Sequence, residues 1–409
     1  MSDLSQFVIP RGFRFGAAKA GLKQSGRTDF ALIVADELAS AAAAFTGNRV
    51  KAAPLLVDAE HLRATGGRVR VVAINAGNAN CAAGQAGIDA ARATCKAAAA
   101  TFACKPEEVF PSSTGVIGVP LPAEKLIAAL PELAKSIGSE SDHFQQVAEA
   151  ILTTDTVEKT AFLPFHMEDD NGNITEVHIA ALCKGSGMIH PQLVPHATML
   201  VYIMTDAKIE PVLLNRYLRE AIEVSFNRIS VDGDTSTNDT VLMLASGASG
   251  VDFGGQFYLP FAEGLKHVCR SLAKQIVGDG EGVSHVVELR IEGAASDADA
   301  VRVAKAIAHS PLVKTAWAGC DPNWGRLMAA IGYSDAEINP DAIDISFGEL
   351  PICRNGGRAT EYDENAAHAY IQQPEFSVAI HLHQGSGSCT FWTTDLTHEY
   401  IRINADYTT

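Results

Sequence analysis

Residues 184–207, KGSGMIHPQLVPHATMLVYIMTDA, place a loop containing glycine and proline directly before an apolar run. No charged residue lies between Gly185 and Thr205. A short, continuous apolar run bounded by turn residues predicts a strand that is buried on both faces. We therefore expect a strand that begins at Thr198, at the edge of a core. This position suits a structural threonine, and it equally suits a nucleophile.

The composition predicts an ordinary soluble globular protein. Of the 409 residues, 47% are hydrophobic and 20% are charged, which is enough apolar surface for two domains or one large composite domain. The net charge of −16 argues against nucleic-acid binding, because phosphate contacts need clustered lysine and arginine residues. The balance of apolar and charged residues excludes a disordered chain.

The cysteine pattern and the N-terminus indicate a reducing, cytoplasmic location. The eight cysteines include no CxxC pair and no zinc-ribbon spacing, so we expect buried or incidental free thiols. The first residues, MSDLSQFVIPRGF, lack the basic and apolar regions of a secretory signal. Prolines, histidines and a glutamine within residues 185–205 argue against a membrane-spanning helix there.

The hydrophobic patterning predicts a mixed α/β fold. The expected strands, besides the one at Thr198, are residues 30–36, 69–75, 116–122, 160–167, 174–183, 285–293, 343–348, 376–385 and 388–396. The expected helices are residues 87–104, 208–229, 261–277 and 297–313. An Asn-Gly turn in EDDNGN, residues 168–173, predicts that the two strands on either side form a hairpin.

Thr198 has a route to activation through its own backbone. A threonine hydroxyl is a poor nucleophile until a base takes its proton. If the peptide bond before Thr198 were cut, the new α-amine, with a reference pKa of about 7.7–8.0, would be its own general base. The same hydroxyl could make the cut by attacking the carbonyl of Ala197, and a strained loop would help. The local features also fit an ordinary strand threonine.

Several other loops carry residues that suit a catalytic site. SSTGVIG, residues 112–118, offers Thr114 and Gly115 in a tight turn, where backbone and hydroxyl donors could face a developing oxyanion. Further loops rich in glycine, asparagine and aspartate are INAGNAN (74–80), SVDGDTSTNDT (230–240), GDGEG (278–282) and GCDPNWGR (319–326). Each alone has the composition of a common turn, so it is their number that points to a site.

Along nearly its whole length the chain resembles the ornithine acetyltransferase family, or glutamate N-acetyltransferases, which are self-cleaving enzymes of arginine biosynthesis. The resemblance rests on an ordered series of motifs: GRTDFALIV, TGNRVKAAP, NAGNAN, SSTGVIG, TTDT, KGSGMIHP, ATML, SFNRISVDGDTSTNDT, GDGEG, SPLVKTAWAGCDPNWGR and INADYTT. It implies a layered α-β-β-α sandwich of the type found in ornithine acetyltransferases and β-peptidyl aminopeptidases.

The resemblance implies where the chain is cut and which residue reacts. In the ATML motif, Thr198 would be both the cleavage residue and the acyl-accepting nucleophile. The cut between Ala197 and Thr198 would give an alpha chain, residues 1–197, and a beta chain, residues 198–409, which together form one composite globular unit. Thr114 and Gly115 match the oxyanion-hole pair of the family.

The resemblance also implies a set of substrate-binding residues. These are Thr154, Lys184, Thr198, Glu281, Asn404 and Thr409. Lys184 would meet a substrate carboxylate and Glu281 the charged amine of ornithine, while the tail closes the pocket. As isolated residues, Lys184 and Glu281 would instead be solvated surface charges.

One loop departs from the family pattern. QLVPH separates Pro191 from Ala197, which makes the loop about three residues longer than in the family; stability tolerates such an insertion. Cleavage depends on local strain, so the insertion bears on the rate of self-processing. The inserted His196 could assist proton transfer or be an exposed loop residue. A metal site from His190 and His196 is disfavoured, because no nearby carboxylate or cysteine completes it.

The activity that the resemblance implies is a ping-pong acetyl transfer from N2-acetyl-L-ornithine to L-glutamate through an acetyl group on Thr198. No metal or organic cofactor is expected, and acetyl-CoA would enter as a second donor substrate in a bifunctional enzyme. The family implies a heterotetramer of two alpha and two beta chains. The alternatives are an amidohydrolase or aminopeptidase on the same self-processing scaffold, and an unprocessed binding protein for acetylated amino acids.

Overall fold

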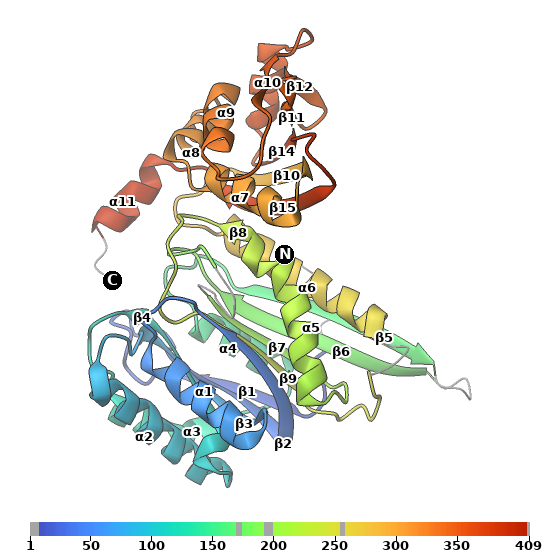
Figure 1. Ribbon diagram of the computed structural model, residues 1–409. Coiled ribbons are helices and arrows are strands. Elements are labelled where there is room, and N and C mark those ends of the chain that lie inside the picture. The colour runs from blue at the N-terminus through green and yellow to red at the C-terminus, as the bar shows by residue number, and fades with distance from the viewer. Residues whose placement is uncertain (1–7, 169–173, 192–198, 254–257, 407–409) are drawn as a thin grey trace.

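Four layers of helix, sheet, sheet and helix form the larger part of the molecule, and a second lobe lies above them (Figure 1). The structure is a computed structural model that describes residues 8–168, 174–191, 199–253 and 258–406. The α-β-β-α layering confirms the predicted fold class.

The first helical layer and the first sheet layer come from the N-terminal part of the chain. The helices are α1 (Ala53–Thr65), α2 (Gly84–Phe102) and α3 (Ala123–Ser136). The strands are β1 (Phe13–Ala18), β2 (Phe30–Phe45), β3 (Arg68–Asn78) and β4 (Val109–Val116). Successive residues of β2 face opposite sides, so Phe30 and Leu32 pack in the core beneath the helices, whereas Ala31 and Ile33 face the core between the sheet layers.

The second sheet layer and its helices follow the same rule. The strands are β5 (Lys159–Glu168), β6 (Ile174–Lys184), β7 (Leu200–Thr205) and β9 (Thr240–Ala245), and the helices are α5 (Pro211–Glu223) and α6 (Tyr258–Gly278). In β7, Leu200 and Tyr202 face the core between the sheets, whereas Val201 and Ile203 pack in the core with α5 and α6. Every residue of β7 is buried, which confirms a strand with two buried faces, although the strand begins at Leu200 rather than at the predicted Thr198.

Strand β2 joins the two sheet layers into one continuous sheet. The order is β4-β3-β2-β9-β7-β6-β5, and β1 pairs with β2 off this path. The first part of β2 pairs with β1, and Ser40–Phe45 pair with β9. The pairing of β2 with β3 has a register irregularity between Val34 and Ala39. Helix α4 (Ser141–Ala150) packs between the layers, where the rings of Phe144 and Phe15 meet edge-on at 5.2 Å.

Segments from both sides of the predicted cleavage point share this sheet. Strand β7 lies between β6, with which it is antiparallel, and β9, with which it is parallel; Leu200 pairs with Lys184. Strand β9 in turn pairs with β2. The cleavage point itself, between Ala197 and Thr198, lies outside the described residues, so the division into chains 1–197 and 198–409 stays a prediction.

The second lobe has its own sheet and its own core. Its strands are β8 (Ile229–Ser230), β10 (Val286–Ala294), β11 (Asp344–Phe347), β12 (Leu350–Arg354), β13 (Gly357–Arg358), β14 (Glu375–His381) and β15 (Gly387–Thr394). Its helices are α7 (Asp297–Ala308), α8 (Pro311–Ala318), α9 (Trp324–Gly332) and α10 (Glu364–Ile371). After β15, helix α11 (His398–Asp406) leads from the lobe back toward the sandwich (Figure 1). Short 3-10 helices are Pro106–Glu108, Phe226–Arg228 and Pro340–Ala342.

Two of the expected elements are wrong in detail. Residues 116–122 are not a strand: β4 ends at Val116, because Gly118 takes a left-handed turn with φ +82° and Pro120 lacks a donor for a sheet ladder. The helix expected over 297–313 is two helices, since the Ser310 hydroxyl caps α8 and the chain turns between them. The other expected strands and helices overlap observed ones, and β5 and β6 pair as the predicted hairpin.

All eight cysteines lie in the described residues and are free; Cys104 and Cys320 are partly exposed and the others are buried. Within the described part of the chain, no helix combines the length and the apolarity needed to cross a membrane.

Candidate active site

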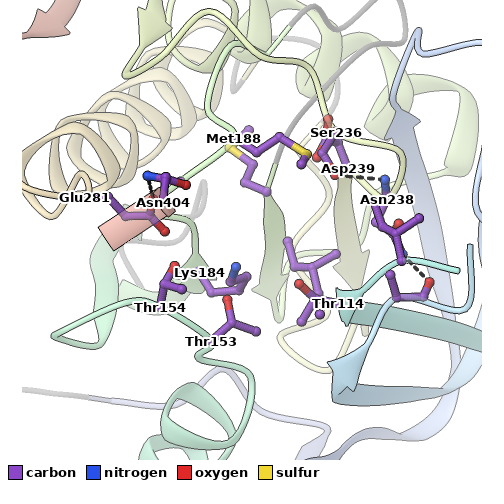
Figure 2. A pocket seen from close by; sticks show the side chains of 16 residues that line it. Thr114, Thr153, Thr154, Lys184, Met188, Ser236, Asn238, Asp239, Glu281 and Asn404 are labelled. Atoms are coloured by element: carbon purple, nitrogen blue, oxygen red, sulfur yellow. Dashed lines mark hydrogen bonds between the residues drawn. The ribbon is translucent and has the colours of Figure 1, made fainter. Parts of the chain in front are cut away.

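A pocket of about 850 Å³, open to solvent, lies beside the first residues of β7. It collects side chains from distant parts of the sequence, and Figure 2 shows Glu281 and Asn404 on one side and Thr114 on the other, with Lys184 between them. The pocket is therefore assembled by the fold rather than by one local motif.

Most of the predicted site residues line this single pocket. They are Thr114, Gly115, Thr154, Lys184, Glu281 and Asn404. Three others, Ala197, Thr198 and Thr409, lie outside the described residues, so their positions stay predictions. The two residues that follow Thr198, Met199 and Leu200, do line the pocket.

The oxyanion-hole candidates lie at the end of β4, where it runs against β3. Gly115 has φ +130°, and a Cβ there would lie 2.3 Å from the carbonyl carbon of Gly77 and 2.5 Å from the amide nitrogen of Asn78. The pairing of β3 with β4 is irregular at this point. Only glycine allows this conformation and this close approach, which together place the backbone of Thr114 and Gly115 at the pocket wall.

Gly115→Ala should therefore disturb both the pocket and the fold. We expect a loss of at least about 2 kcal/mol in the free energy of unfolding, because alanine disfavours a left-handed backbone and its Cβ would clash with the backbone of β3. Gly118→Ala is the matched control, since Gly118 also has a positive φ but a Cβ there meets no atom within 4 Å. Chemical unfolding of both variants checks this, and equal losses would contradict the close-approach argument.

Buried asparagine side chains hold the loops around Gly115 in place. Asn238 Nδ2 donates to the carbonyls of Ala79 (2.6 Å) and Ser113 (2.8 Å), which ties the loop before β9 to the ends of β3 and β4. Asn75 accepts from the Ser113 hydroxyl at 2.6 Å and donates to the Asn78 carbonyl at 2.8 Å. The NAGNAN motif thus works as a scaffold for the pocket wall.

Charges near Lys184 are arranged in a buried network. Asp155 is enclosed; its Oδ1 accepts from Lys159 Nζ at 2.8 Å and from the Gly185 amide at 2.6 Å. Lys184 Nζ is farther away, 3.6 Å from Asp155 Oδ2. Lys159 also pairs with Asp279. Lys159 is thus held by two close carboxylates. Lys184 has one more distant carboxylate partner among the described residues and lines the pocket, where its N–H donors can meet a ligand.

The network fixes the charge state of Asp155. Burial alone would raise the pKa of this carboxyl, but the positive charges of Lys184 and Lys159 and the hydrogen bonds to it outweigh burial and hold the pKa below its ordinary value. Lys159 shows the reverse balance: burial would lower its pKa, and the two carboxylates raise it above its ordinary value. Both groups are therefore charged at neutral pH.

The acidic side of the pocket comes from Glu281 and α11. Asn404 Nδ2 donates to Glu281 Oε2 at 2.9 Å, so the last described helix is joined to the pocket by a side-chain contact. A Cβ at Gly187 would lie 2.4 Å from the Glu281 carboxyl carbon, so a side chain at position 187 would displace the carboxylate from its present place in the pocket. Glu281 thus presents a negative charge opposite the wall that Thr114 forms (Figure 2).

The chain is firmly held on both sides of the predicted cleavage loop. Upstream, the amides of Met188 and Ile189 donate to Asp232 at 2.7 and 2.8 Å, and burial raises the pKa of that carboxyl to about 6 although these amides oppose the shift. Downstream, the Thr240 amide donates to the Met199 carbonyl at 2.8 Å. His190, considered above with His196 as a metal ligand, contacts His309 instead, with 3.2 Å between ring nitrogens; His196 lies outside the described residues.

Sequence reasoning missed several residues of the site. Asp155 and Lys159 organise the charges behind Lys184, and Asn238 holds the loops around Gly115. Asp155 lies in the quoted TTDT motif and Asn238 in the quoted SVDGDTSTNDT loop, so both segments were recognised as candidates. The composition of a loop does not tell which of its side chains contacts which strand.

Comparisons with known proteins agree over almost the whole chain. Residues 14–409 match the model of the ArgJ family. The arginine biosynthesis bifunctional protein ArgJ of Geobacter sulfurreducens is 44% identical over 98% of this chain and 99% of its own length. The ArgJ protein of Thermus thermophilus is 42% identical over 98% of this chain and 99% of its own.

A solved structure is similar as well. The arginine biosynthesis bifunctional protein ArgJ of Bacillus halodurans is 42% identical, with a TM-score of 0.50, and the match covers 51% of this chain and 100% of that one. The family model matches nearly the whole chain, and the relatives share more than two fifths of their residues with this chain over nearly their whole length. This chain therefore belongs to the ArgJ family.

Proposed function

We propose that this chain is a glutamate N-acetyltransferase that moves the acetyl group of N2-acetyl-L-ornithine to L-glutamate. The observation that carries the proposal is the pocket itself, in which a lysine and a glutamate face one space that is also lined by the Gly115 turn at the end of β4 and by the first residues of β7. Acetylornithine carries a carboxylate, an amide carbonyl and an ammonium group, so each part of it has a partner of suitable chemistry. The relatives' role in arginine biosynthesis agrees with this substrate.

The proposed mechanism runs through an ester on Thr198. The freed α-amine of Thr198 takes the hydroxyl proton, and the oxygen attacks the acetyl carbonyl. Donors at Thr114 and Gly115 stabilise the tetrahedral oxyanion. The carbon–nitrogen bond then breaks, and ornithine leaves with the proton. The amine of glutamate attacks the acetyl-threonine ester, which releases N-acetylglutamate and restores the hydroxyl. Lys184 holds the substrate carboxylate and Glu281 the ammonium group of ornithine.

The assay that tests this function measures ornithine release from N2-acetyl-L-ornithine with and without L-glutamate. Transfer predicts that ornithine and N-acetylglutamate appear together and that both need glutamate. Ornithine release at the same rate without glutamate would instead assign the pocket to an amidohydrolase. A further arm replaces acetylornithine by acetyl-CoA; formation of N-acetylglutamate there supports the second donor activity that the word bifunctional in the relatives' names suggests.

Self-cleavage is part of the same proposal. Intact-mass measurement should give two pieces whose second begins at Thr198, and sedimentation should give a particle with two copies of each. We also propose a cytoplasmic location and a reaction that uses no metal or organic cofactor. A single uncut chain without acetyl transfer would favour the unprocessed binding protein.

Glu281→Gln should weaken use of acetylornithine while the fold persists. The amide keeps the size and an acceptor for Asn404 but removes the negative charge, and a charged hydrogen bond contributes about 1.5–3 kcal/mol, so kcat/KM should fall by about 10- to 100-fold. Glu263→Gln, which changes an exposed glutamate of α6, is the matched control. Steady-state kinetics and thermal melts of both variants check this. A melting temperature that falls together with kcat/KM in Glu281→Gln would argue for a structural role of Glu281.

A further inference from the structure

Three reactive side chains that do not line the pocket described above meet in the second lobe. His285 Nδ1 lies 3.0 Å from Asp395 Oδ2, and His285 Nε2 lies 3.8 Å from the Sγ of Cys320. Asp395 and His285 are buried, whereas Cys320 is partly exposed. A nucleophile, a base and a group that orients the base therefore contact one another in succession. Of the three, only the nucleophile is open to solvent.

The arrangement fixes the role of each ring nitrogen of His285. The Asp395 carboxylate only accepts hydrogen bonds, so the neutral ring carries its proton on Nδ1 and points the Nε2 lone pair at Cys320. The position of Asp395 is itself determined, because Asp395 Oδ1 also accepts from the Ser284 amide at 3.1 Å. This leaves Nε2 as a proton acceptor for the thiol.

The backbone at Cys320 indicates that the side chain has a use. Cys320 follows the C-cap of α8 and has φ +51°, in the left-handed region. The Asp321 amide donates to the Ala316 carbonyl at 2.8 Å and the Cys320 amide to that of Trp317 at 2.9 Å, which is the Schellman pattern of a helix end. Glycine is the residue that fits this position without strain. A cysteine here is less favourable for the helix end and places a thiol beside His285.

We propose that Cys320, His285 and Asp395 form an activated thiol that takes up small disulfides, a covalent modification site separate from acetyl transfer. The Cys320 proton passes to His285 Nε2, and the thiolate attacks one sulfur of the disulfide. A new bond forms between Cys320 Sγ and that sulfur, the original sulfur–sulfur bond breaks, and the released thiolate takes the proton from His285. No oxidant beyond the disulfide is consumed. The proposal does not depend on the activity proposed above.

The test uses the full-length protein and oxidised glutathione, with adducts located by peptide mass spectrometry over time. Cys104 is the internal control, because it is also partly exposed but contacts no histidine among the residues that the structure describes, and burial and Glu108 raise the pKa of its thiol to about 11. We expect the adduct on Cys320 to form at least about tenfold faster than on Cys104, since the thiolate is the attacking species. Similar rates at the two thiols would overturn the proposal.

Three variants separate activation from exposure. Asp395→Asn and His285→Gln should each slow adduct formation at Cys320 by about tenfold and leave Cys104 unchanged, since the base is misoriented or removed. Loss of structure would have the opposite effect, because an unfolded lobe exposes the thiol and speeds the reaction. Cys320→Gly should form no adduct at that position and should melt no lower than the wild type. An unchanged rate at Cys320 in both Asp395→Asn and His285→Gln would refute activation.

Discussion

Thr198→Ala is expected to leave the chain uncut and to abolish acetyl transfer. The substitution removes the hydroxyl that would attack both the Ala197 carbonyl and the substrate, and without the cut no α-amine is freed to act as its base. Loss of a nucleophile in a catalytic unit of this kind lowers the rate by about 10⁴-fold or more. Intact-mass measurement of the purified variant and the ornithine-release assay check both consequences.

The conservative replacement separates the chemistry from the packing. Thr198→Ser keeps a hydroxyl and should retain cleavage and part of the transfer activity. Thr101→Ala, which changes an exposed threonine of α2, should leave both properties unchanged. If Thr198→Ala still produced two chain pieces, or if an acetyl group were trapped on a different side chain during turnover, the proposed nucleophile would be wrong.

Asp155→Asn should have the largest effect on stability among the polar substitutions of the site. Removing one partner of a buried ion pair leaves an uncompensated charge, and such changes cost about 3–5 kcal/mol. Here the carboxylate serves both Lys159 and Lys184, and its loss removes the 2.8 Å contact to Lys159 and the group that faces Lys184 from behind the pocket. Substrate affinity should therefore fall together with the midpoint of chemical unfolding.

The pH dependence gives this prediction a second readout. The folded-state pKa of Asp155 is held below its ordinary value, so its stabilising effect is fully present above the unfolded-state pKa of about 3.9 and is lost as the pH falls below it. The stability difference between wild type and Asp155→Asn should be constant near neutral pH and shrink below about pH 4. Glu132→Gln, which breaks the exposed pair with Lys135, should change stability by less than about 1 kcal/mol.

The sequence was most informative where both faces of a strand are buried. The apolar run that becomes β7 and the apolar run FALIVA at the start of β2 both reflect burial on two faces, so they could be recognised. The second part of β2 could not: residues 39–44, ASAAAA, have high helix propensity, yet they form a strand because Ser40–Phe45 pair with β9. Sheet pairing between Ser40–Phe45 and the remote segment Thr240–Ala245 overrides the local preference here.

The residues of the site also fall into two groups, those that the sequence made recognisable and those that it did not. Motifs resembling a known family located Thr114, Lys184 and Glu281, and the fold brings these into one pocket. The residues that support them, such as Asp155 and Asn238, act through contacts between loops that are remote in sequence. Such contacts depend on strand order and register, which no single loop composition records.

The position of β7 between β6 and β9 also has a consequence for how the protein can be synthesised. If residues 1–191 and 199–409 were translated from two separate genes, each product would present a bare strand edge, β6 in the first and β7 in the second, that attracts foreign strands. An uninterrupted polypeptide avoids this hazard, since both edges are covered within the same newly made molecule. A cut in the backbone between β6 and β7 would leave the ladder between these strands intact, so the two fragments would stay paired.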